Sequence, residues 1–217
     1  MYNYFNDHIS SDQVDELKRF IDLAKKQKLG YVSQAFWYPA EEEPRCVVEK
    51  YIQEDVKSKM PYGAYAGCEW WFRVTPPGEG NTLHYDKDER LLNKKGALRH
   101  PLVATVLYLD DTKVPTVLLP SGPDGEEVLI RAKKGRLLAF AGNILHGVWD
   151  NDTSEERYTI MYNVWGEEPL DLPRYPETET GFTAYAGENT RRVGMTFAGG
   201  PEKWQTNHVL LKNYLGK

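Results

Sequence analysis

Residues 102–111 read LVATVLYLDD, a run of β-branched, aliphatic and aromatic side chains that ends in two aspartates. Such runs are typical of β-strands, because these side chains fit a pleated, half-buried surface. Similar runs lie on both sides of it, namely CEWWFRV (68–74), VPTVLLP (114–120), VLIRA (128–132), LLAFAG (137–142) and RYTIMYNVW (157–165). The segment SGPDGEE between the second and third of these predicts a hairpin. The chain after Pro61 therefore predicts a strand-rich fold.

The residues before Pro61 predict two helices instead. Ser10 and Gln13 fit a capping box, Gly30 is placed to end the first helix, and an apolar stripe repeats at helical spacing through Val14, Leu17, Ile21 and Ala24. The segment from 44 to 60 repeats this pattern. Two helices followed by many short strands predict a mainly β, α+β fold, with two sheets in a sandwich or barrel and the helices packed outside.

The length of 217 residues suits one domain over residues 1–217, which would bury roughly 70% of its unfolded surface. We expect residues 1–60 to form a helical support, residues 61–166 to form the strand-rich core, and residues 167–217 to form an extension. This extension is rich in turn-forming residues, and either a cover over an active site or a surface wrap would suit it.

Composition limits the classes of partner. The formal net charge of −5 disfavours a nucleic-acid binder, which normally carries a basic face. The N-terminus lacks the pattern of a signal peptide, and no apolar run is long enough for a membrane span. Cys46 and Cys68 form no metal or redox motif, and we expect them to be reduced thiols in a cytoplasmic protein. The oligomeric state stays open.

A metal site is suggested by LHYDKDE, residues 83–89. Side chains two apart on a strand share a face, so His84 and Asp86 can reach one ion, and His146 follows the strand run LLAFAG. Two histidines and one carboxylate make the facial triad of non-haem Fe(II) oxygenases. Arg157 opens the next strand run, and its guanidinium can hold a carboxylate through two hydrogen bonds. Taken singly, each feature also suits a chance pair, a surface histidine or an arginine in an ordinary ion pair.

Residues 68 to 166 resemble the Fe(II)- and 2-oxoglutarate-dependent oxygenase superfamily, in its prolyl-hydroxylase-like branch. The resemblance rests on LHYDKDE, TVLYLDD, KKGRLLAFAGNILHGV and RYTI. It implies a double-stranded β-helix, or jelly-roll, core. It also implies a dioxygenase that uses Fe(II), 2-oxoglutarate and O2, and that couples the loss of carbon dioxide to hydroxylation of an unactivated C–H bond.

The resemblance assigns roles to matching residues. His84, Asp86 and His146 would bind Fe(II), and Arg157 would bind the C5 carboxylate of 2-oxoglutarate. Two further residues are predicted near the cosubstrate: Tyr108, for which a core position is the alternative, and Thr116. Halogenases of the superfamily lack the carboxylate ligand, so Asp86 favours hydroxylation. Desaturation, ring formation and demethylation stay open.

The residues predicted to meet the substrate are Asp88, Asn163, Trp70 and Arg73. Trp70 and Trp71 point to opposite faces of their strand, so only one of them can face the site. Asn163 shares a face with Arg157, and its alternative is a solvent-exposed strand end. Arg191 and Arg192 are further candidates for an acidic group of the substrate.

Four classes of function stay open at this stage. We favour hydroxylation of a small molecule, such as an amino acid or a natural-product intermediate, because no appended binding module is evident. Hydroxylation of a residue in a protein or peptide is the first alternative. Nucleic-acid demethylases can share the H-x-D-K-D-E pattern, but they carry a second arginine where this chain has Asn163. A cupin-type metal enzyme without 2-oxoglutarate is the fourth class, and it would leave Arg157 and Tyr108 without a role. Outside these four, a non-catalytic binding module that has lost its metal is disfavoured, because all three ligand types are present.

Overall fold

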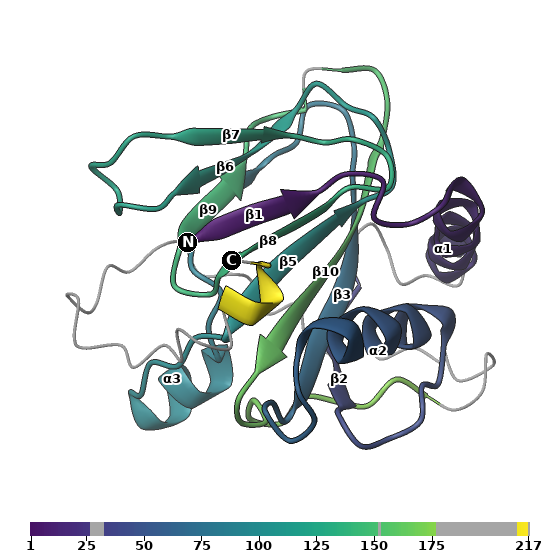
Figure 1. Cartoon of the computed structure of the whole chain (residues 1–217). Helices are drawn as coiled ribbons and strands as arrows, with labels where there is room; N and C mark the ends of the chain where they lie inside the picture. Colours follow the sequence, from purple (N-terminus) through teal and green to yellow (C-terminus); the bar gives the residue numbers. More distant parts are fainter. Residues whose placement is uncertain (27–32, 152, 177–211, 217) are drawn as a thin grey trace.

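The computed structural model of the chain describes residues 1–26, 33–151, 153–176 and 212–216. Its strands form two antiparallel sheets that face each other (Figure 1). The larger sheet has the order β1 (Tyr2–Phe5), β8 (Leu137–Ala141), β5 (Val103–Tyr108), β10 (Arg157–Trp165), β3 (Gly67–Thr75), β2 (Phe36–Pro39). The smaller sheet has the order β4 (Asn81–His84), β9 (Leu145–Val148), β6 (Pro115–Leu119), β7 (Val128–Arg131). The predicted mainly β, double-sheet fold is confirmed.

Every strand run that the sequence predicts becomes a strand, including the hairpin of β6 and β7, where Pro115 pairs with Arg131. Four short elements were not predicted: β1, β2, β9 and the helix α3 (Glu89–Lys95). The three strands have four residues each, too few to show a period, and β1 and β2 add to the edges of the larger sheet. The helix α3 lies in the charged run after the H-x-D pair, with Asp88 as its N-cap and Gly96 in the left-handed region at φ 66° as its C-cap.

The two predicted helices are present as α1 (Ser11–Ala24) and α2 (Val47–Lys59). The capping box of Ser10 and Gln13 is confirmed, whereas Gly30 lies outside the described residues. Helix α2 begins later than its sequence pattern suggests, because the backbone of its N-cap, Cys46, is still extended. Figure 1 shows both helices on the outer side of the larger sheet, away from the smaller sheet. Among these described helices none is long and apolar enough to cross a membrane.

A buried polar cluster joins α2 to the outer face of the larger sheet. Both carboxylate oxygens of Asp55 are occupied: Oδ1 accepts from His8 at 2.6 Å and from Lys59, and Oδ2 accepts from Tyr162 and Tyr214 at 2.6 Å each. We call these five residues the Asp55 cluster. Burial alone raises the pKa of Asp55, but the contacts with His8, Lys59 and Tyr162 outweigh it and lower the pKa to about 2. The cluster ties both ends of the described chain to the sheet.

The predicted extension, residues 167–217, lies largely outside the described residues, and Arg191 and Arg192 lie there too. Its first part returns to the outer face of the larger sheet. There Arg174 pairs with Glu49 of α2 at 3.0 Å, and the Tyr175 ring packs against Trp70 at 5.5 Å between centroids. Earlier residues of the extension contact the α3 side instead, where Asp171 pairs with Lys94 and Glu167 pairs with Arg99. In the described part, the extension therefore packs both against the outer face of the larger sheet and against the α3 side.

Candidate metal centre

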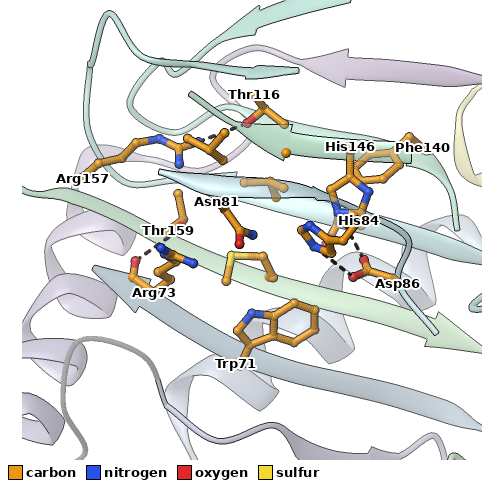
Figure 2. Close-up of a pocket in the computed structure, with 15 residues that line it drawn as sticks. Trp71, Arg73, Asn81, His84, Asp86, Thr116, Phe140, His146, Arg157 and Thr159 are labelled. Atoms are coloured by element: carbon orange, nitrogen blue, oxygen red, sulfur yellow. Dashed lines mark hydrogen bonds and ion pairs between the residues drawn. The ribbon is translucent and has the colours of Figure 1, made fainter. Parts of the chain in front are cut away.

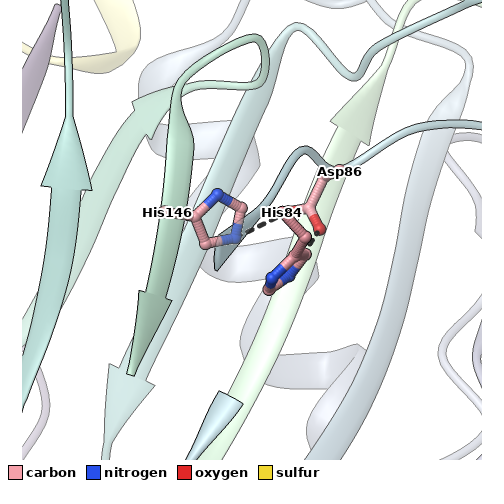
Figure 3. A group of neighbouring side chains, drawn as sticks. All are labelled: His84, Asp86 and His146. Carbon is pink, nitrogen blue, oxygen red and sulfur yellow. Dashed lines mark ion pairs between the residues drawn. The ribbon is translucent and has the colours of Figure 1, made fainter. Parts of the chain in front are cut away.

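Two adjacent strands bring the two histidines together. Strands β4 and β9 pair antiparallel, and His84 stands directly opposite His146 in their register, with ring centroids 4.4 Å apart. Asp86 lies just beyond the end of β4, in the loop that leads to α3. Its Oδ1 lies 3.8 Å from Nε2 of His84 and its Oδ2 lies 3.7 Å from Nε2 of His146. Figure 3 shows the three side chains pointing toward one another.

Asp86 was expected to share a strand face with His84, but the structure positions it in another way. Alternation along a strand does not place it, because β4 ends at His84. The loop is held instead by His100, whose Nδ1 donates to the backbone oxygen of Asp86 at 2.5 Å. Each residue of the triad offers one ligand atom, and these atoms lie within 4.8 Å of one another. The three residues were predicted together, and the structure brings them together.

Local hydrogen bonds orient both histidines for metal binding. Nδ1 of His84 lies 2.8 Å from the carbonyl oxygen of Thr82, and Nδ1 of His146 lies 2.9 Å from that of Ile144. A carbonyl oxygen only accepts, so Nδ1 of each ring carries the proton and Nε2 offers a lone pair. Phe140 packs edge-on against the ring of His146 at 4.7 Å. Hydrogen bonds of this kind, with the non-ligating nitrogen held, are usual at metal-binding histidines.

The triad stands at one end of a pocket between the two sheets, with Arg157 at the other end (Figure 2). The cavity has a volume of about 50 Å³ and opens to solvent. Its walls also include Trp71, Val106 and Met161 from the larger sheet.

Arg157 is buried, with 2% of its surface exposed, and one of its terminal nitrogens donates to Thr116 Oγ1 at 3.1 Å. No carboxylate of the described residues forms an ion pair with it, and its Nε has no hydrogen-bond partner there. Burial lowers the pKa of Arg157, which shows how poorly the protein alone solvates this charge. A buried cation without a counter-charge is costly, so this end of the pocket fits a carboxylate ligand.

Tyr108 and Thr116 complete this end of the pocket in different ways. Thr116 lines the pocket, and its Oγ1 accepts from both Tyr108 at 2.7 Å and Arg157. With both lone pairs occupied, the hydroxyl hydrogen of Thr116 is left to donate to a ligand. Tyr108 is fully buried behind it and stacks under the guanidinium of Arg157 at 5.3 Å. Tyr108 therefore positions Thr116 and Arg157 rather than lining the pocket.

No protein-family model matches the chain, and no curated protein matches it in sequence. Solved structures match its fold. A Pseudomonas putida prolyl-4-hydroxylase aligns with 77% of this chain and 93% of its own, at 16% identity and a TM-score of 0.55. SnoK, a non-haem α-ketoglutarate-dependent carbocyclase from nogalamycin biosynthesis, aligns with 84% of this chain and 86% of its own, at 10% identity and a TM-score of 0.54.

HygX from Streptomyces hygroscopicus, solved with nickel and 2-oxoglutarate bound, aligns with 81% of this chain and 85% of its own, at 12% identity and a TM-score of 0.51. The chain shares the jelly-roll fold of these solved structures. At these identities the likeness concerns the fold, and the chemistry rests on the residues of this chain.

Within this fold, two of the residues predicted to meet the substrate lie elsewhere. Trp70 is fully buried on the outer face of β3, where its Nε1 donates to Glu49 of α2 at 3.2 Å. The prediction for Trp70 is wrong, because strand alternation gives the pocket face to Trp71.

The prediction for Asp88 is wrong as well. Its side chain caps α3 through the backbone N–H of Leu91 at 2.9 Å and pairs with Arg99 at 2.7 Å. These contacts, together with the N–H of Leu170, outweigh the effect of burial and lower the pKa of Asp88. Asp88 is a structural residue of the loop that follows the metal strand.

Arg73 and Asn163 lie on the pocket face of the larger sheet. Arg73 lines the pocket and donates to the backbone oxygen of Gly80 at 2.6 Å. Asn163 follows Met161 along the same face of β10, just past the lining residues, and it is 1% exposed. The alternative of a solvent-exposed strand end is therefore wrong for Asn163.

Several residues near the site were missed. Asn81 and Phe140 line the pocket, but neither residue type carried a signal in the sequence. Glu69 stands opposite Asn163 in the register of β3 and β10, and its Oε2 accepts from Asn163 at 3.4 Å and from Trp165 at 3.1 Å. Burial first, and then the charge of Asp86, raise the pKa of Glu69 to about 7. Alternation along CEWWFRV could have found it, because Glu69 shares a face with Trp71 and Arg73.

Proposed function

We propose that this chain is an Fe(II)- and 2-oxoglutarate-dependent dioxygenase that hydroxylates an unactivated C–H bond of a small molecule. One observation carries the proposal: a His-Asp-His triad and a buried arginine without a counter-charge stand at opposite ends of one pocket. A metal ion at the first end and a carboxylate at the second would satisfy both. 2-Oxoglutarate carries a chelating group and a distal carboxylate, which suits this separation.

In this proposal Fe(II) is held by Nε2 of His84, Nε2 of His146 and the carboxylate of Asp86. The bound metal and its cosubstrate supply the oxidative chemistry, in which O2 is activated as 2-oxoglutarate is converted to succinate and carbon dioxide. The backbone oxygens of Thr82 and Ile144 hold the two imidazoles in the tautomer that presents Nε2. Three ligands on one face leave positions open for other groups.

Arg157 and Thr116 would bind the C5 carboxylate of 2-oxoglutarate. The guanidinium offers its unpaired N–H, and the hydroxyl of Thr116 offers its remaining hydrogen. Tyr108 keeps both groups in place from behind. The apolar side chains of Trp71, Val106 and Met161 limit water between the two ends of the pocket, which strengthens these polar contacts.

A small-molecule substrate remains our first candidate, as the sequence predicted, and the pocket between the two sheets is where it would bind. The similar folds include both a prolyl-4-hydroxylase and a carbocyclase of natural-product biosynthesis. A residue in a protein or peptide is therefore the second candidate. We also propose that residues 1–217 act as one oxygenase domain, with residues 1–60 supporting the larger sheet from outside.

The test is an anaerobic titration of the purified protein with Fe(II) and 2-oxoglutarate, followed through the weak visible absorption band of the chelated complex. We expect a band only when both are present. Arg157→Met should require roughly 10- to 100-fold more 2-oxoglutarate, because a charged hydrogen bond is lost. Arg131→Met on the exposed face of β7 is the matched control and should behave as the wild type. Metal binding without any band would contradict the proposal and favour a metal enzyme that does not use 2-oxoglutarate.

A further inference from the structure

Glu69 and Asn163 form a row on the pocket face of the larger sheet. They pair directly in the register of β3 and β10, and the next pair along is Trp71 with Met161, both of which line the pocket. Alternation therefore gives Glu69 and Asn163 the same face as these lining residues. Across the sheet, Asn163 pairs with Ala104 and Ala104 pairs with Phe140, whose ring packs against the metal-site residue His146. The row thus lies one register pair beyond the lining residues, on the same face and toward the metal end of the pocket.

This row holds hydrogen-bond acceptors that the protein does not satisfy. Oδ1 of Asn163 is buried and has no hydrogen-bond partner among the described residues. Both donors that reach Glu69, from Asn163 and Trp165, go to Oε2. Within the described ranges Oε1 of Glu69 has no donor, and no lysine or arginine pairs with this carboxylate. Glu69 is only partly buried, so Oε1 stays accessible to a ligand, whereas the oxygen of Asn163 is buried without a partner.

A purely structural role accounts for only part of this arrangement. Holding the Trp165 indole and the Asn163 amide requires one acceptor oxygen, which a neutral glutamine would supply equally well. The second oxygen, the charge of Glu69 and the unpaired oxygen of Asn163 stay unexplained. An anionic ligand is disfavoured by the carboxylate of Glu69, and a neutral hydroxyl would leave that carboxylate without a cationic partner.

We propose that Glu69 and Asn163 bind a protonated amine of the substrate, and so select amine-bearing small molecules for hydroxylation at the adjacent metal centre. This inference rests on the proposed function, since it places the amine beside the group that would be oxidised. An ammonium group has three donors, so it can reach Oε1 of Glu69 and Oδ1 of Asn163 together. The indole Nε1 of Trp165 donates to the other carboxylate oxygen, Oε2, at 3.1 Å and so holds Glu69 in place.

The experiment compares Glu69→Gln with Glu54→Gln, which removes a charge from the exposed side of α2. Each protein is loaded with Fe(II) and 2-oxoglutarate, and the absorption band of the complex is recorded first. The probes are L-amino acid amides with their neutral N-acetyl derivatives, and linear alkylamines with alcohols of equal length. Binding is read from the change in the band and from succinate release under air.

We expect amines to bind more tightly than their neutral analogues in the wild type and in Glu54→Gln. Glu69→Gln should weaken amine binding roughly 10- to 100-fold, while neutral probes change little. Asn163→Leu, which keeps the charge, should weaken it roughly 2- to 10-fold. This second variant keeps the test decisive if Glu69→Gln folds poorly.

Equal affinity for amines and their neutral analogues would overturn the amine subsite, as would unchanged amine binding in both variants. A panel in which no amine alters the band or the succinate release would overturn it as well. In each case an intact absorption band leaves the proposed dioxygenase standing. Loss of the band from the wild type would instead mark the failure of the proposed function itself.

Discussion

The two faces of strand β10 carry buried polar groups in opposite conditions. On the outer face, Tyr162 belongs to the Asp55 cluster, in which each carboxylate oxygen has two donors. On the pocket face, Arg157 has no counter-charge among the described residues, and Asn163 has an unpaired oxygen. Both faces belong to one strand and both are buried, so burial alone does not distinguish them.

Paired polar groups on the outer face stabilise the fold, whereas unpaired polar groups on the pocket face are available to bind a ligand. A buried charge that is fully hydrogen-bonded can contribute to stability, whereas an unpaired one lowers it until a partner binds. Replacement of a residue in the Asp55 cluster should therefore change the free energy of unfolding but not the affinity for ligands. Replacement of a residue on the pocket face should change the affinity for ligands but hardly lower the stability. Four predictions test this contrast, in order of decreasing effect.

Replacement of the metal ligand His84 should give the largest effect. In His84→Ala we expect affinity for Fe(II) to fall by at least about 100-fold, because a first ligand matters more than the outer contacts that cost 10- to 100-fold. The unfolding midpoint should barely move, since the side chain of His84 is partly exposed and lies outside the core. Metal titration and thermal unfolding of the apoprotein measure the two quantities.

His8→Ala is the matched control for that variant, because it removes the histidine of the Asp55 cluster. It should lower stability and leave metal affinity unchanged. If the two histidine variants lost metal affinity equally, the proposed division between the faces would be wrong.

Replacement of Asp55 should give the largest loss of stability. In Asp55→Asn we expect the free energy of unfolding to fall by about 3 kcal/mol, because the ion pair with Lys59 is broken in a buried place. Denaturant unfolding measures this loss. The affinity for 2-oxoglutarate, measured on the folded fraction, should stay within about twofold of the wild type. A large change in affinity would show that the outer cluster controls the pocket.

The variant Arg157→Met should change stability and ligand binding in opposite directions. Methionine fills a similar volume without a charge, so the apoprotein should be unchanged or more stable by about 1 kcal/mol. Addition of 2-oxoglutarate with Fe(II) should raise the unfolding temperature of the wild type but not of this variant. Clear destabilisation of the apoprotein would mean that Arg157 already has its partner within the chain.

The last prediction concerns acid, and its effect is smaller than the full loss expected in Asp55→Asn. The pKa of Asp55 is about 2 in the folded protein and 3.8 in the reference state, so its charged form stabilises the fold. This contribution, about 2 kcal/mol, is complete above pH ~5 and is lost as the pH falls toward the folded pKa. The stability difference between the wild type and Asp55→Asn should therefore shrink between pH ~5 and pH ~2. A stability difference that stays constant over this pH range would show that Asp55 does not have a lowered pKa in the folded protein.

The strand runs determined most of the fold by themselves. Each run in CEWWFRV, LVATVLYLDD, LLAFAG and RYTIMYNVW became a strand, because the apolar β-formers and the turn residues between them act locally. The four-residue strands β1 and β2 were missed for the opposite reason. They are strands only because a sheet edge is there to pair with, and pairing partners distant in sequence leave no local pattern.

The site residues also fall into those that the sequence predicted and those that only the tertiary structure decided. His84, Asp86, His146 and Arg157 could be selected from the sequence, because residue type and order carry the chemistry of a metal and a carboxylate. Which side chains complete the pocket was decided by the tertiary structure. The sequence could not say which of Trp70 and Trp71 faces inward, since alternation fixes only that they differ. Packing of α2 on one face of β3 settled this choice and left Glu69 on the side of the metal centre. Composition and order thus determine which chemistry the chain can perform, whereas the packing of helices and sheets determines which residues meet the substrate, because only packing makes one face of a strand different from the other.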